Sequence, residues 1–205
     1  MRRFACIATL LVAFVLAGCG VPPPPAQQTE EVSRLASAIR ALGPDVDADE
    51  AARAARVAYA HTETLARQYE IVDPPLVHNT KVNMGLKPRG LCWHWAEDME
   101  TRLKAEEFET LEMHRAVANA ETVFRLEHST AIISARGESF DEGIVLDPWR
   151  KGGQMTWVPV AEDDRYDWKA RPAVLARKLE RRHGEAVTLT ETGRFLVAGG
   201  EYTTQ

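Results

Sequence analysis

The chain has 205 residues, of which 45% are hydrophobic, and its formal net charge is -5. This length is enough for one domain with a hydrophobic core. An acidic balance without clustered positive charge gives no reason to expect nucleic-acid binding, and no nucleic-acid partner is expected.

The first nineteen residues have the layout of an export signal. Arg2 and Arg3 precede an uncharged apolar run over residues 4–16, which is too short to span a bilayer comfortably. The sequence LAGC over residues 16–19 resembles the lipobox of bacterial lipoproteins, in which the signal is cut before a cysteine that then carries lipid. The resemblance implies a signal peptide of residues 1–18 and lipid on Cys19. An ordinary cleaved signal and an uncleaved anchor helix are the alternatives.

A short tether is expected after this cysteine. In lipoproteins of this kind, Gly20 resembles the sorting pattern of the outer membrane, which implies a lipid-anchored protein of the cell envelope that faces the periplasm. Residues 19–28 hold the lipidated cysteine and a proline-rich run that should be extended and semi-rigid. Residues 29–205 should form a single domain. Its expected parts are a helical N-terminal part (29–75), a catalytic-like core (76–160) and a C-terminal extension (161–205).

Two helices are expected at the start of this domain. The first has its apolar residues on one face and is ended by a Gly-Pro pair at 43–44. The second should begin at a capping box made by Asp47 and Glu50 and should end near Tyr69. The residues that share the face of the first helix are Val32, Leu35, Ile39 and Leu42.

Residues 76–89 are rich in polar residues, glycine and proline, and are expected to be a loop. His78 in this stretch is expected at the surface. A helix of about residues 91–106 should follow, because apolar residues recur there at spacings of three and four. These residues are Cys92, Trp95, Ala96, Met99 and Leu103.

The second half of the domain reads as mostly strands. Helices first and strands afterwards indicate an α+β domain with an antiparallel sheet. Pro172 should open a helix that ends near Gly184, and the acidic run 162–164 should be a solvated loop. The expected strands are 110–118, 128–135, 142–147 and 157–160, with a hairpin within 188–197.

Cys92 is the one cysteine outside the first nineteen residues, so it has no partner for a disulfide within the mature domain. A thiolate is stabilised at a helix N-terminus, and the thiolate is the nucleophile in cysteine catalysis. Such a nucleophile needs a base and a group that orients the base. His128 begins one predicted strand and Asp147 ends the next, so antiparallel pairing can bring them side by side.

The order Cys92, His128, Asp147, with Asp147-Pro148-Trp149 after a strand, resembles the transglutaminase-like domains of the papain-like cysteine superfamily. The resemblance covers about residues 76–160. It implies a central helix that carries the cysteine and packs on an antiparallel sheet, with N-terminal helices added. It also implies a hydrolase or acyl transferase that acts on peptide or isopeptide bonds through a thioester on Cys92.

The same resemblance implies further roles in the site. The oxyanion would be held by the backbone N–H of Cys92 and by Asn79 or Asn83, and the sequence does not choose between these two. Trp93 and Trp149 are candidate walls of a substrate cleft. Residues 89–92 also resemble arylamine acetyltransferases. Those proteins are longer and use acetyl-CoA, which is not expected outside the cytoplasm, so no cofactor is expected.

Other interpretations of the same residues remain open. The domain could be a catalytically silent member of the fold that serves as an envelope binding or assembly module, or a structural lipoprotein of unrelated fold. Cys92 could be a small buried hydrophobic residue. A metal site at Cys92 and His94 is not expected, because residues two apart on a helix point in different directions. No second Cys/His pair has ligand spacing either.

Overall fold

The computed structural model describes residues 25–184, 187–190, 194–197 and 200–202. The predicted signal peptide, Cys19 and residues 19–24 of the predicted tether lie outside the described residues. By its internal contacts the chain divides into residues 1–31 and residues 32–205. Apart from the helical residues 25–31, the fold below is that of the second unit. Among the described residues, no helix combines the length and the apolar character needed to cross a membrane.

Helix α2 spans Pro25–Arg40 and helix α3 spans Ala48–Gln68. Residues 25–28 are therefore helical, and the expectation of an extended tether is wrong for them. A proline fits the first turn of a helix, because its missing N–H has no partner there in any case. Leu35 and Ile39 are fully buried, which confirms the predicted apolar face of the first helix.

The N-terminus of α3 is capped by Asp47, whose carboxylate accepts hydrogen bonds from the backbone N–H groups of Asp49 and Glu50 at 2.9 Å each. The reciprocal half of the predicted capping box is wrong. The Glu50 carboxylate accepts from the backbone N–H of Glu109 (2.7 Å) and from the backbone N–H (2.8 Å) and hydroxyl (2.6 Å) of Thr110. Glu50 therefore joins the start of α3 to the start of the sheet.

The central sheet has five antiparallel strands in the order β4-β3-β2-β1-β5, which confirms the α+β class. In its register Ala118 lies opposite His128, and Ala131 lies opposite Leu146. The strands are β1 (Leu111–Ala118), β2 (His128–Ala135), β3 (Ile144–Leu146), β4 (Trp157–Pro159) and β5 (Lys169–Ala170).

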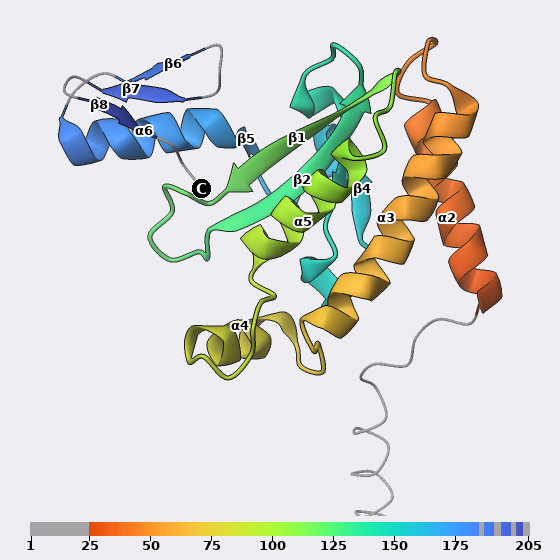
Figure 1. The fold of residues 1–205 in the computed structure, drawn as a ribbon, viewed down its shortest axis with the longest axis horizontal. Helices are drawn as coiled ribbons and strands as arrows, with labels where there is room; N and C mark the ends of the chain where they lie inside the picture. Colours follow the sequence, from red (N-terminus) through yellow and green to blue (C-terminus); the bar gives the residue numbers. More distant parts are fainter. Residues whose placement is uncertain (1–24, 185–186, 191–193, 198–199, 203–205) are drawn as a thin grey trace, which may run out of the picture. The chain divides into compact units, whose positions relative to one another are not determined.

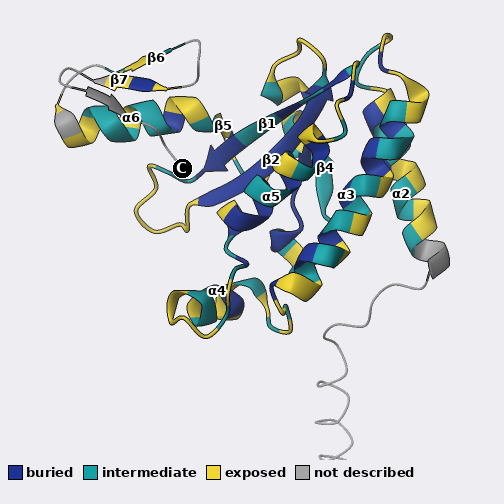
Figure 2. Ribbon diagram, viewed as in Figure 1, coloured by how far each residue is buried: buried dark blue, intermediate teal, exposed yellow. Residues whose placement is uncertain are grey.

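Helix α5, Cys92–Lys104, packs on one face of this sheet, with α3 beside it (Figure 1). Successive strand residues point to opposite faces. Ala131 and Ile133 therefore join the core with Met99 of α5, whereas Ile132 joins a cluster on the other face. The predicted apolar stripe of α5 is buried, and Figure 2 shows the central strand β2 almost entirely buried.

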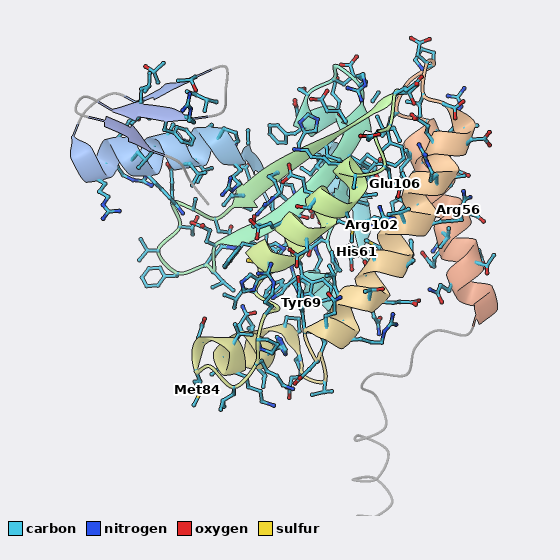
Figure 3. The ribbon with its side chains drawn as sticks, in the orientation of Figure 1. Arg56, His61, Tyr69, Met84, Arg102 and Glu106 are labelled. Atoms are coloured by element: carbon cyan, nitrogen blue, oxygen red, sulfur yellow. The ribbon has the colours of Figure 1, made fainter. Side chains whose placement is uncertain are left out.

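Polar contacts fix α5 against α3. Asp98 on α5 accepts a hydrogen bond from the Tyr69 hydroxyl at the end of α3, and its backbone carbonyl lies 3.2 Å from His61 Nε2. Beyond the end of α5, Glu106 bonds Arg102 of α5 at 2.5 Å and lies 3.6 Å from Arg53 Nε of α3. Figure 3 shows His61, Tyr69, Arg102 and Glu106 along the junction of the two helices. The helix that begins with Cys92 is thus held along its length.

The predicted loop over 76–89 is wrong in its first half, which forms helix α4, Pro75–Asn83. Pro75 occupies the first turn, and His78 is the buried side chain of the helix. Met84 follows the helix and is exposed (Figure 3).

The C-terminal part holds α6, Arg171–His183, which ends at Gly184 in the left-handed conformation as predicted. A second antiparallel sheet follows in the order β6-β7-β8. Its strands are Thr188–Leu189, Phe195–Val197 and Gly200–Tyr202, so a hairpin within 188–197 is confirmed. Short 3-10 turns lie at Phe140–Glu142 (η1), Trp149–Lys151 (η2) and Val160–Glu162 (η3).

Candidate functional site

Cys92 is the first residue of α5, as predicted, and His94 caps this helix end. The backbone N–H groups of Gly90 and Leu91 donate to His94 Nδ1 at 3.1 and 3.2 Å. Burial lowers the pKa of His94 to about 4, and the positive charge of Arg89 acts in the same direction. His94 is therefore neutral at pH 7, and its Nδ1 orders the turn that leads into Cys92.

The turn before Cys92 also needs a glycine. Gly90 has a φ of +122°, and a Cβ at this position would lie 2.4 Å from His78 Nε2. That imidazole is 1% exposed, and its Nε2 lies 2.8 Å from the carbonyl oxygen of Arg89. The expectation that His78 is a surface residue is wrong, because α4 presses it against the backbone that leads into Cys92.

His128 and Asp147 meet as predicted from their places in the strands. His128 begins β2, and Asp147 follows β3 directly, so the antiparallel pairing of β2 with β3 brings them together. His128 Nε2 lies 2.6 Å from Asp147 Oδ2, and both side chains are 1% exposed. The carboxylate therefore holds the imidazole through a buried, charge-assisted hydrogen bond.

Cys92 approaches the same imidazole from α5. Burial alone would lower the pKa of His128, but the charge and hydrogen bond of Asp147 raise it, and the interaction with Cys92 raises it further, to about 9. Because Nε2 is bound to Asp147, the buried Nδ1 is the ring nitrogen left for the thiol. Nδ1 has no hydrogen-bond partner among the described residues. Cys92 Sγ also lies 3.8 Å from the carbonyl oxygen of Glu127.

Access to the three side chains differs. Cys92 is 9% exposed, whereas His128 and Asp147 are almost completely buried. The imidazole is surrounded by the rings of Trp149 (4.7 Å between centroids), Tyr166 (4.7 Å) and Trp168 (5.5 Å). A reactant therefore reaches the thiol first, with the imidazole behind it in a water-poor environment.

The two tryptophans expected at a substrate cleft are placed differently. Trp149 is 7% exposed, covers His128 and donates from its indole Nε1 to Asn79 Oδ1 at 3.0 Å. Trp93 is 44% exposed, and its ring lies 3.8 Å from that of His94. Trp149 is thus an inner wall of the site, and Trp93 lies at its surface next to the thiol-bearing residue.

The two asparagines proposed as oxyanion donors also differ. Asn79 lies in α4, bound to Trp149, and the contact between α4 and η2 brings it to the site. Asn83 is exposed at the last position of α4. The structure therefore joins Asn79, and not Asn83, to a residue that touches the imidazole.

Three residues that the sequence did not indicate complete the surroundings of Asp147. Arg150 bonds Asp147 and also Asp163, which is bonded in turn by Trp168. The side chain of Asp163 is 2% exposed. The expectation of a solvated acidic loop over residues 162–164 is therefore wrong for Asp163.

A hollow of about 620 Å³ lies at the connection between α2 and α3, lined among others by Arg40, Asp45 and Glu50. None of its lining residues belongs to the Cys92 site. Among the residues that the structure describes, no group of three or more His, Cys, Asp or Glu side chains is arranged to hold a metal ion.

No protein-family model matches the chain, no curated protein matches its sequence, and no solved structure matches it.

Proposed function

We propose that the protein is a cysteine hydrolase or acyl transferase that acts on peptide or isopeptide amide bonds through Cys92, His128 and Asp147. One observation carries the proposal: the buried imidazole of His128 binds Asp147 at 2.6 Å through Nε2, while its Nδ1 is unpaired among the described residues and Cys92 is near enough to raise the pKa of the imidazole. A nucleophile, a base and a group that orients the base are the parts that acyl transfer requires. Taken alone, each of these residues has a structural explanation, but their convergence favours catalysis.

The reaction follows from this arrangement. The thiol proton passes to His128, and Cys92 Sγ forms a bond to the amide carbonyl carbon. The backbone N–H of Cys92 stabilises the oxyanion, with Asn79 as the second donor. The C–N bond then breaks as His128 gives its proton to the leaving amine, and a thioester remains on Cys92. Water or an amine then attacks the thioester carbonyl and His128 accepts its proton. The C–S bond breaks, which releases the acyl product and leaves Cys92 as a thiolate beside the protonated imidazole.

The environment of His128 suits both halves of this reaction. A pKa of about 9 makes the protonated imidazole a suitable acid for a leaving amine, whose own pKa lies in a similar range. Part of this shift comes from the thiol itself. Once Cys92 is a neutral thioester, that contribution disappears, so the pKa of His128 falls and the imidazole becomes available as a base.

We place this activity at the bacterial cell envelope, with the domain held by lipid on Cys19 near the outer membrane and facing the periplasm. Support comes from the sequence of residues 1–20 alone. The substrate would be a peptide or protein within reach of a tethered domain. Several acyl chains would anchor it stably, because a single chain gives only marginal membrane binding.

A catalytically silent binding or assembly module is the second candidate. It is favoured by the burial of the three side chains, since His128 and Asp147 are each 1% exposed and aromatic rings surround the imidazole. In such a module the thiol would be packed and unreactive.

The test is the reactivity of Cys92 in the native, full-length protein. The rate of alkylation by iodoacetamide would be followed on the Cys92 peptide by mass spectrometry from pH 5 to 10. His128→Ala would be compared with a matched control, His114→Ala, on the neighbouring strand. Incubation with p-nitrophenyl acetate would show whether an acetyl group is formed on Cys92 and then lost.

For an enzyme, native Cys92 reacts, its pH profile changes in His128→Ala but not in His114→Ala, and the acetyl group turns over. A thiol that reacts only after unfolding, with the same rate in all three proteins, would overturn the proposal and leave the binding module.

A further inference from the structure

Arg150 contacts both oxygens of the Asp147 carboxylate. Its backbone N–H donates to Oδ1 at 3.2 Å, and its side-chain Nε donates to Oδ2 at 3.0 Å. Oδ2 is also the oxygen that His128 binds. Asp147 is therefore held by the imidazole and by Arg150 at once, and the guanidinium lies beside the hydrogen bond between His128 and Asp147.

The rest of the Arg150 guanidinium binds a second carboxylate. Nη1 and Nη2 bond the two oxygens of Asp163 at 3.2 and 2.8 Å. Asp163 also accepts from Trp168 Nε1 at 2.9 Å, and the ring of Trp168 lies 5.5 Å from that of His128. These contacts therefore lead back to the imidazole and form a closed ring of five residues. We call it the His128 ring, and its members are His128, Asp147, Arg150, Asp163 and Trp168.

We propose that Arg150 is a positioning residue of the site, which fixes the Asp147 carboxylate toward His128, and that Asp163 and Trp168 hold Arg150 in the conformation that does so. The inference rests on the proposed function for its catalytic meaning, since it assigns a residue to the same site.

The chemistry of the side chain supports this assignment. Guanidinium is planar and presents its donors in a rigid fork, so it can bond two carboxylates in fixed directions at once. A lysine would offer one compact ammonium and could not reproduce both contacts. The Arg150 side chain is 10% exposed, and its guanidinium lies 4.8 Å from the Tyr166 ring. Burial would lower the pKa of Arg150, but the hydrogen bonds and charges of Asp163 and Asp147 raise it. The side chain is therefore packed in place and not free to follow a substrate.

The position of Asp147 in the chain also leaves the orientation of its carboxylate unfixed by the backbone. Asp147 follows β3, which has three residues, and it precedes Pro148 and the turn η2. Its backbone pairs with that of Thr156, but no such pairing restricts rotation of its carboxylate. Two bonds from Arg150 remove that rotation. The carboxylate therefore loses its conformational entropy when the protein folds, before substrate binds.

The experiment measures the His128 imidazole directly, so its outcome does not depend on a known substrate. The pKa of His128 would be determined by NMR titration in the full-length protein, with the resonance assigned from a His128→Gln variant. Arg150→Lys keeps the charge but loses the fork. Trp168→Phe keeps the ring against His128 but loses the bond to Asp163. Arg177→Lys, at an exposed ion pair on α6, is the control.

If Arg150 positions Asp147, the pKa of His128 falls by about one unit in Arg150→Lys, because an opposite charge held nearby is worth one to three units. Trp168→Phe shifts it less in the same direction, and Arg177→Lys does not shift it. If the pKa of His128 stays the same or rises in both Arg150→Lys and Trp168→Phe, the inference is overturned. Should Arg150→Lys fail to fold, as judged by circular dichroism, Trp168→Phe decides alone.

The two proposals can fail separately. If an acetyl group turns over on Cys92 but the pKa of His128 is unchanged in Arg150→Lys and Trp168→Phe, the proposed enzyme activity stands and the role of Arg150 is rejected. If the pKa of His128 shifts as expected but Cys92 is unreactive, the His128 ring has a structural role and catalysis is rejected.

Discussion

Cys92 and Asp147 act on the same imidazole from different elements, the thiol from the first turn of α5 and the carboxylate from the end of β3, and both raise the pKa of His128. The state of the thiol is therefore coupled to the acidity of the imidazole. This coupling leads to the first prediction.

Alkylation of Cys92 with iodoacetamide replaces the thiol by a neutral thioether. We expect the pKa of His128 to fall below its value of about 9, because the contribution of the thiol is lost while that of Asp147 remains. NMR titration of His128 before and after alkylation measures the change. An unchanged value would mean that the two side chains do not interact.

The stability of the fold should depend on pH through the same imidazole. The pKa of His128 is raised from 6.5 to about 9 in the folded protein, so its contribution is fully present below pH 6.5 and is lost as the pH rises through 9. The shift corresponds to about 3 kcal/mol. Urea unfolding at pH 6 and pH 9.5 measures the loss. In His128→Gln the difference between the two pH values should shrink, and an equal difference in both proteins would contradict the assignment.

Gly90→Ala should destabilise the protein strongly. The new Cβ would lie 2.4 Å from His78 Nε2, and the φ of +122° is strained for alanine. Gly137→Ala is a matched control, because Gly137 also has a positive φ of +85° but has no atom within 4 Å of the added Cβ. Strain alone costs about 1 kcal/mol or more. We expect Gly90→Ala to cost at least about 2 kcal/mol beyond the control in urea unfolding. Equal costs would show that the contact with His78 is easily relieved.

Glu50→Ala should destabilise the junction between α3 and the sheet by about 2 kcal/mol or more, because it leaves the backbone N–H groups of Glu109 and Thr110 without their acceptor. Burial would raise the pKa of Glu50, but the hydrogen bonds from Thr110 and Glu109 and the charge of Arg53 hold it below its usual value. Its contribution is therefore present at neutral pH and is lost as the pH falls through that lowered value.

Unfolding by urea at pH 7 and pH 3 tests this assignment, with Glu63→Ala on the same helix as control. A Glu50→Ala variant as stable as the control at pH 7 would contradict it.

The periodic elements could be predicted from the sequence, because their apolar residues recur at helical or strand spacing. The stripe from Cys92 to Leu103 and the strands around His128 and Asp147 are of this kind, and the meeting of His128 with Asp147 followed from strand order alone. The apolar pattern does not predict helix α4, because this helix buries only His78 and so has no apolar period. Pro75 in its first turn was the available signal.

The partners of Asp147 could not be predicted in the same way. Arg150 precedes β4 in the chain and its partner Asp163 follows it, and nothing in the local sequence distinguishes Asp163 from its exposed neighbours Glu162 and Asp164. The partners of Glu50 could not be predicted for a related reason, since Glu109 and Thr110 lie about sixty residues away in the sequence. Polar pairs between residues far apart in the chain produce no regular spacing in the sequence, whereas the packing of apolar faces does.

The His128 ring also has a consequence for the way the site recovers after each reaction. Imidazole, carboxylate, guanidinium and carboxylate follow one another in the interior, and their formal charges cancel when the imidazole is protonated. Each time His128 gives away its proton, this row keeps one uncompensated negative charge in surroundings that screen it poorly. The return of a proton is therefore favoured, and the protein restores its own resting state by electroneutrality.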